Sequence, residues 1–149
     1  MLDPAAETIQ LDVSFSGLSS NDVAAHIHCC EPLGTNAVVA TAVPAFAGFP
    51  LGATSGTYTS PIFDLTQSSF YNPAFVTAEG SVALAEAALI AGIENGQTYF
   101  NIHTMNIPGG EIRGQLTAVP LPGALPLFAT GLGALGLLGW RRKKNARAT

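Results

Sequence analysis

The chain has 149 residues, of which 48% are hydrophobic and only 11% are charged. The length fits one domain, and the low charged fraction indicates that an apolar segment is joined to it. Five of its six basic residues lie beyond position 140, so residues 1–117 hold ten carboxylates and a single cation, Arg113. A net charge of about −9 on this part excludes nucleic-acid binding, because phosphate contacts need Lys and Arg. We expect a carboxylate, Glu111 or a neighbour across the sheet, to pair with Arg113.

The first part of the chain predicts β-strands. Residues 9–15 and 23–30 alternate apolar and polar side chains, as half-buried strands do. In the second strand the alternation gives the core side Val23, Ala25, Ile27 and Cys29, and the opposite side His26, His28 and Cys30. Adjacent cysteines in a strand point to opposite faces. We therefore expect one buried and one exposed thiol rather than a disulfide, with a ligand role for Cys30 left open.

The middle of the chain predicts one further strand and one helix. Residues 57–65 form the strand, and residues 70–75 are aromatic but interrupted by Pro73. Residues 81–92 have apolar side chains at helical spacing, and Ser81 stands where a helix cap is expected. The sequence therefore predicts a single short helix in a β-rich domain.

A hairpin closes the domain, with residues 98–104 and 110–116 as its two strands. If Thr104 faces Gly110, the polar face pairs Asn101 with Arg113 and His103 with Glu111. Antiparallel strands with this alternation pack face to face around one core. We therefore predict an all-β fold, an antiparallel Ig-like β-sandwich with one short helix.

The three histidines define a candidate site. His26 and His28 lie two residues apart on one strand face, and His103 with Glu111 completes a four-ligand set of the kind that binds Cu or Zn. A hydrogen-bonded polar layer that fixes strand register, with Asn101 and Arg113 as members, explains the same residues. The chain shows no Ser/His/Asp set, no carboxylates paired at fixed spacing and no phosphate-binding glycine loop. We therefore expect a protein that is not an enzyme and has no catalytic residues.

The C-terminal part predicts a membrane span. Residues 121–140 carry no charge and would reach about 30 Å as a helix, the thickness of a bilayer core. Trp140 stands at the interface position, followed directly by Arg141, Arg142, Lys143 and Lys144. This order predicts a transmembrane helix with its basic end in the cytoplasm and the body on the non-cytoplasmic side. Residues 1–8 show no secretory signal, since they lack a basic start and a long apolar run.

Residues 118–149 resemble a VPLP-type PEP-CTERM sorting tail. The likeness rests on the motif Val119, Pro120, Leu121 and Pro122, the Gly/Leu-rich span and the basic end. Such tails occur in bacteria that make extracellular polysaccharide, and the resemblance implies an exosortase, a membrane transpeptidase, as partner. It also implies passage through the inner membrane to the cell surface or exterior, where extracellular polysaccharide or matrix is a candidate partner.

Residues 9–117 resemble the CHRD domain, the module named after chordin. The segments that carry the likeness are 16–18, 25–28, 48–52, 71–75, 89–92, 99–104 and 108–116. Two features depart from the family pattern: residues 29–32 read Cys-Cys-Glu-Pro, and the opening strands of the family are not visible before Ile9. We therefore expect an N-terminally incomplete domain in which residues 1–8 are an extension. Two functions remain open: a non-enzymatic cell-surface or matrix β-domain, and a periplasmic or extracellular Cu- or Zn-binding protein.

Overall fold

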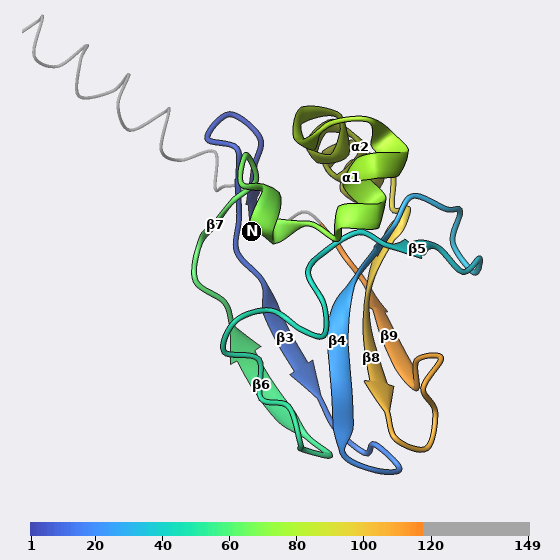
Figure 1. The fold of residues 1–149 in the computed structure, drawn as a ribbon. Helices are drawn as coiled ribbons and strands as arrows, with labels where there is room; N and C mark the ends of the chain where they lie inside the picture. The colour runs from blue at the N-terminus through green and yellow to red at the C-terminus, as the bar shows by residue number, and fades with distance from the viewer. Residues whose placement is uncertain (118–149) are drawn as a thin grey trace, which may run out of the picture. The chain divides into compact units, whose positions relative to one another are not determined.

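The computed structural model describes residues 1–117 of the chain (Figure 1). Within this part, the elements follow in the order β1 Leu2–Asp3, β2 Thr8–Ile9, β3 Asp12–Phe15, β4 Asp22–Cys29, β5 Val38–Val39, β6 Gly56–Thr59, β7 Phe63–Asp64, the 3-10 helix Ser68–Phe70, α1 Pro73–Glu79, α2 Val82–Glu94, β8 Thr98–Thr104 and β9 Ile112–Gln115. The predicted sorting motif, the span 121–140 and the basic cluster 141–144 lie outside the described residues.

The strands form three antiparallel sheets. The largest has the order β5-β4-β8-β9, and the long strands β4 and β8 pair at its centre. β3 pairs with β6, and β1, β2 and β7 form a small third sheet. The prediction of a mostly β, antiparallel fold is confirmed at this level.

Two helices are present where the sequence predicted one. α2 follows the prediction closely, and Ser81 caps it by accepting a hydrogen bond from the backbone N–H of Leu84 at 3.2 Å. The missed helix is α1, which has Asn72 as its cap and Pro73 in its first turn. Proline has no N–H to lose at a helix start, so Pro73 begins a helix here rather than breaking a strand. Figure 1 shows both helices near the same end of the four-stranded sheet.

No single helix among residues 1–117 is both long and apolar enough to cross a membrane. α1 and α2 together reach the required length and composition, but the chain bends by 93° between them.

The core of the domain is built around aromatic rings. Phe49, in the loop before β6, lies with its ring centroid 5.7 Å from Phe15 of β3 and 5.6 Å from Phe100 of β8. Aliphatic side chains complete the core, including Ile27, Leu65 and Leu89, all fully buried. Residues 1–8, set apart as an extension in the sequence analysis, contribute β1, and Leu2 pairs with Ile9 and lies in the core.

Two predicted strands are interrupted. Residues 57–65 divide into β6 and β7 because Pro61 between them has no N–H for a sheet. Residues 9–15 divide into β2 and β3, and at the break the Leu11 N–H donates to the side chain of Ser60 at 2.9 Å. Val23, predicted to face the core, is exposed because the register between β4 and β8 shifts just before Ala24.

The cysteine prediction was wrong. Cys29 and Cys30 form a disulfide, and both sulfur atoms lie within 3.7 Å of the Ala88 carbonyl oxygen on α2. At Cys30 the chain leaves β4 with φ +154°, so the strand alternation that would have turned its side chain to the histidine face stops there. Cys30 therefore packs towards α2 and lies away from the candidate site.

Candidate metal centre

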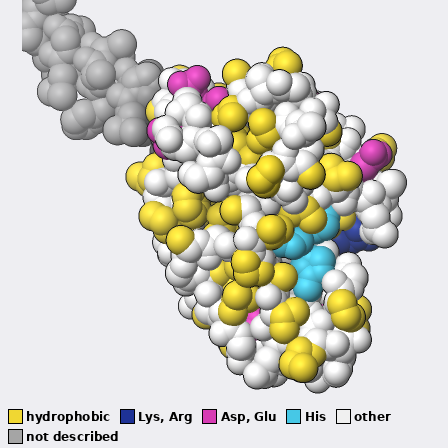
Figure 2. Space-filling model, in the orientation of Figure 1, with side chains coloured by type: hydrophobic (Ala, Val, Ile, Leu, Met, Phe, Trp, Pro, Cys, Tyr) yellow, Lys and Arg dark blue, Asp and Glu magenta, His cyan; other side chains and the backbone are white. Residues whose placement is uncertain are grey.

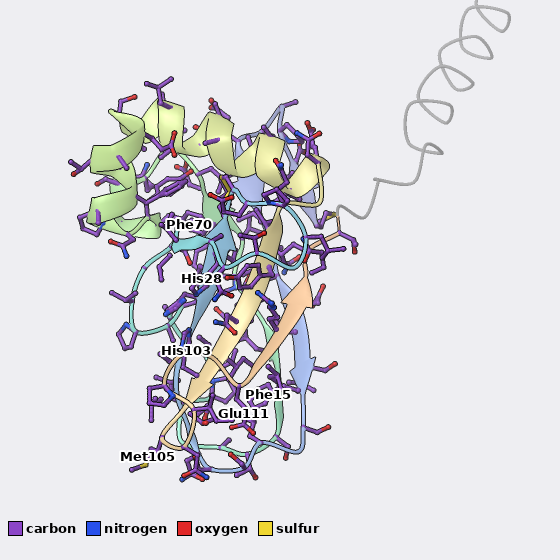
Figure 3. The ribbon with its side chains drawn as sticks, turned by 90° about the vertical axis from the view of Figure 1, so that its right-hand side faces the viewer. Phe15, His28, Phe70, His103, Met105 and Glu111 are labelled. Atoms are coloured by element: carbon purple, nitrogen blue, oxygen red, sulfur yellow. A yellow bond between two sulfur atoms is a disulfide. The ribbon has the colours of Figure 1, made fainter. Side chains whose placement is uncertain are left out.

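The three histidines meet on the outer face of the four-stranded sheet. His26 and His28 extend from β4, His103 extends from β8, and one ligand nitrogen of each lies within 4.8 Å of the others. Their ring centroids are 4.6 to 5.8 Å apart. The prediction that His26 and His28 share one strand face is confirmed, because β4 keeps its two-residue period between them. Figure 3 shows His28 and His103 one below the other on this face.

Backbone carbonyls fix two of the rings. His28 Nδ1 lies 2.8 Å from the carbonyl oxygen of Ala37, and His103 Nδ1 lies 2.8 Å from that of Pro108. A carbonyl oxygen only accepts, so each Nδ1 carries the proton and donates. The lone pair of each ring is therefore on Nε2, which is the tautomer that a metal ligand requires.

Three of the remaining ring nitrogens are poorly satisfied. His26 Nδ1 and His28 Nε2 are both buried and have no hydrogen-bond partner within residues 1–117. In the described part of the chain, His103 Nε2 is paired only with the side-chain amide of Asn101, at 3.3 Å. Leaving a buried polar atom unpaired costs about 1–3 kcal/mol, so this cluster is a costly arrangement without a ligand.

Burial favours the neutral form of the imidazoles of His26 and His28. The pKa of His26 is lowered to about 4, chiefly because burial penalises the charged ring and also because His103 and His28 lie beside it. Burial likewise lowers the pKa of His28, although the Ala37 carbonyl partly opposes this. Neutral rings at neutral pH hold free lone pairs, which metal binding needs.

The geometry suits one small transition-metal ion. Zinc binds imidazole nitrogen at about 2.0–2.1 Å, and a tetrahedral centre holds its nitrogens about 3.4 Å apart. The ligand nitrogens here lie within 4.8 Å of one another, so they would have to move closer to reach that spacing. All three ligands come from the sheet, and the histidine side chains are visible at the surface in Figure 2. Three protein ligands would leave one position of a tetrahedral ion for a further ligand.

Glu111, predicted as the fourth ligand, does not join the histidines. Its carboxylate accepts hydrogen bonds from the backbone and side chain of Ser19 and from the hydroxyl of Thr104. These bonds hold it towards the hairpin turn, where Figure 3 shows it near Met105. The paired register of β8 and β9 ends at Ile102 and Ile112, so it does not include the predicted pair of His103 and Glu111. The Glu111 N–H instead donates to the Ile102 carbonyl at 2.8 Å, and the side chain is directed to the loop before β4.

The other two predicted members lie beside the cluster. Asn101 pairs with Arg113 across β8 and β9, so the predicted register is confirmed. The predicted carboxylate partner of Arg113 was wrong. Its guanidinium instead donates to the carbonyl of Thr35 and the side chain of Asn36, and lies 4.9 Å from the ring centroid of Tyr99.

Sequence reasoning missed the residues that support the histidines. Tyr99 was not among the predicted site residues, yet it stacks on His28 with ring centroids 4.9 Å apart. Gly110 packs against the Asn101 side chain so closely that a Cβ would collide with it, and its φ is +108°. The adjacent Gly109 and Gly110 were a usable signal for such a close approach. The carbonyls of Ala37 and Pro108 left no signal in the sequence, because every residue type carries a backbone carbonyl.

Together the fold and the site define an antiparallel β-domain with three buried or partly buried imidazoles gathered on one sheet face. The chain belongs to the CHRD domain family, whose pattern matches residues 1–116. No curated protein and no solved structure matches it.

Proposed function

We propose that this CHRD domain binds one divalent transition-metal ion, copper or zinc, through His26, His28 and His103. One observation carries the proposal: the three rings bring one ligand nitrogen each within 4.8 Å of the others, and two buried imidazole nitrogens among them have no partner within residues 1–117. The rings of His28 and His103 are also anchored through Nδ1. Metal-binding histidines usually have such a second partner, which sets the tautomer and the ring orientation.

The alternative, a polar layer that fixes strand register, fits the hydrogen bonding less well. Such a layer stabilises a fold when every buried member has a partner, and a partly satisfied one is costly. Here His26 Nδ1 and His28 Nε2 have none within residues 1–117. An ion would engage the unpaired nitrogens. We assign the site to binding rather than to catalysis.

Metal analysis tests this proposal. The full-length chain is purified in detergent without a histidine tag, stripped with chelator, dialysed against Cu²⁺ or Zn²⁺, and its metal content is measured. We expect one ion per chain for the wild type and loss of stoichiometric binding for His26→Gln and for His103→Gln. Glu111→Gln, which alters the neighbouring carboxylate outside the cluster, should keep one ion. Circular dichroism establishes that each variant is folded, and a folded wild type without stoichiometric metal would refute the proposal.

A second candidate function concerns where the domain works, and it is compatible with the first. We propose that the chain is a non-enzymatic surface or matrix protein, exported and then sorted by an exosortase. The support is the sequence pattern of residues 119–144: the Val-Pro-Leu-Pro motif, the uncharged span and the four basic residues. Extracellular polysaccharide or matrix would be its surroundings.

Mass spectrometry of the surface-exposed protein tests the sorting proposal. In a host with its exosortase, the exported form should end between residues 120 and 126, and deletion of Arg141 to Lys144 should impair this processing. Surface protein that still carries the intact basic end would contradict sorting and indicate a simple single-span anchor.

We also propose that the sheets form the two layers of an Ig-like sandwich. The support is the line of rings from Phe15 of β3 through Phe49 to Phe100 of β8, which links the two-stranded and four-stranded sheets through one core. A crystal structure in which these two sheets do not face each other would contradict this arrangement.

A further inference from the structure

We infer that the open coordination position of the proposed metal centre takes an anion, in particular a carboxylate, with Arg113 strengthening its binding. This inference rests on the proposed metal site. It adds the chemical class of the ligand that the site presents to the solvent.

The ligand set leaves the metal charge uncompensated. Three neutral imidazoles around a divalent ion keep its full charge of +2, and the nearest predicted carboxylate, Glu111, is held by Ser19 and Thr104. Carboxylate ligands would have neutralised the ion from within the protein. No carboxylate belongs to the histidine group within residues 1–117. The positive charge of the ion would therefore attract an external anion to the open coordination position.

Arg113 adds positive charge at the same place. It is the single Lys or Arg among residues 1–117, a region with ten carboxylates. Its guanidinium lies over Tyr99, whose ring stacks on His28, and it is close enough to act on the charge of His28. Figure 2 shows the basic side chain directly beside the histidines on the surface. The only Lys or Arg among residues 1–117 therefore stands next to the proposed metal.

Asn101 supplies a hydrogen-bond donor. Its amide nitrogen lies 3.3 Å from His103 Nε2, the nitrogen whose lone pair the metal would take. Once that lone pair is used, the amide is free to donate to an oxygen bound at the metal. Gly110 packs against the Asn101 side chain and keeps it in this position.

One group opposes an anion. Glu31 lines a hollow of about 300 Å³ together with Arg113, Tyr99, Gln115 and residues 32–34. Its carboxylate would repel a bound anion that extends into this hollow. Glu31 therefore offers a variant whose expected effect has the opposite sign to that of Arg113.

Acetate binding to the Cu²⁺-loaded full-length protein tests the inference. The visible absorption band of copper is followed while acetate is added at constant ionic strength, with perchlorate as the balancing anion. We expect a saturable spectral change in the wild type and about 2- to 10-fold weaker acetate binding in Arg113→Gln, while copper stoichiometry stays at one. Arg113→Lys should restore most of the affinity, since the charge and not the guanidinium shape is responsible. Glu31→Gln should bind acetate more tightly.

The outcomes separate this inference from the metal proposal. If the wild type takes up no copper, the metal proposal fails and the anion site fails with it. If copper binds but acetate leaves its spectrum unchanged, only the anion site is refuted. Equal acetate affinity in the wild type and Arg113→Gln would overturn the role of Arg113.

Discussion

The phenol ring of Tyr99 lies against the imidazole of His28, with the ring centroids 4.9 Å apart and the planes inclined by only 10°. The hydroxyl oxygen of Tyr99 accepts a hydrogen bond from the Ala37 N–H at 3.1 Å. The Ala37 carbonyl in turn accepts a hydrogen bond from His28 Nδ1 at 2.8 Å. Tyr99 therefore positions His28 directly, through its ring, and indirectly, through the backbone of Ala37.

Replacement of Tyr99 by Phe should weaken metal binding by about 10-fold, because partners of metal ligands typically contribute that much or more to affinity. The ring remains, but Ala37 loses the hydrogen bond that holds its carbonyl in place. The dissociation constant is measured by competition with a chelator. Tyr58→Phe is a matched control, because Tyr58 is equally buried and its hydroxyl also makes one backbone hydrogen bond, to Ala47 at 2.9 Å. Equal affinities in the two variants would contradict the role of Tyr99.

Glu111→Gln should lower the melting temperature at pH 7. Hydrogen bonds from Thr104 and Ser19 lower the pKa of Glu111 below its ordinary value of 4.5. A group whose pKa is lowered by folding stabilises the fold above its ordinary pKa, and this contribution is lost as the pH falls through the folded value. The difference in melting temperature between wild type and variant should therefore narrow below pH 4.5.

The control for this prediction is Glu94→Gln, at the exposed end of α2. It should melt close to the wild type at pH 7. If Glu111→Gln has the same melting temperature as Glu94→Gln at pH 7, the hydrogen bonds from Ser19 and Thr104 do not stabilise the fold.

The position of the site was partly predictable from the sequence. The two-residue period of β4 placed His26 and His28 on one face, and the hairpin register paired Asn101 with Arg113. The direction of the Glu111 side chain was not predictable, because it depends on Ser19, a residue 92 positions away. A strand pattern gives the face of a residue and says nothing about long-range partners beyond the sheet.

Local sequence signals also predicted only part of the fold. α2 was predicted because its apolar spacing and its serine cap are local signals. α1 was missed because Pro73 was interpreted as a break, although Asn72 before it is a cap of the same kind as Ser81. The disulfide was missed because the alternation of β4 was extended one residue too far, to Cys30.

Gly92→Ala should destabilise the protein by about 1–3 kcal/mol, as overpacking of a core typically does. A Cβ at Gly92 would lie 2.6 Å from Cys29 Sγ and 3.0 Å from Thr98 Cγ2, and the disulfide sulfur cannot move aside easily. This collision should outweigh the gain of about 1 kcal/mol that alanine gives in a helix. Urea unfolding measures the change, and Gly109→Ala, where a Cβ meets nothing within 4 Å, is the control. Equal or greater stability of Gly92→Ala would show that α2 packs less tightly against β4.

The metal-free protein should lose stability as the pH falls from about 6.5 to about 4. His26 has its pKa lowered from 6.5 to about 4, so the unfolded chain binds a proton in this range that the folded chain does not. Its contribution is complete above pH 6.5, and about 2–3 kcal/mol is lost by pH 4. Urea unfolding in the presence of chelator, compared with His26→Gln, isolates this contribution. A wild type and a variant with parallel pH dependence would show that His26 titrates normally.

The most direct test of the central claim is an anomalous-difference map from crystals of the full-length protein loaded with Zn²⁺, recorded at the zinc absorption edge. The proposal predicts one peak per chain, about 2.0–2.1 Å from a nitrogen of each of His26, His28 and His103, with a solvent or anion oxygen as the fourth ligand. A folded domain with no peak among these three rings, or with zinc bound only elsewhere, would contradict the account.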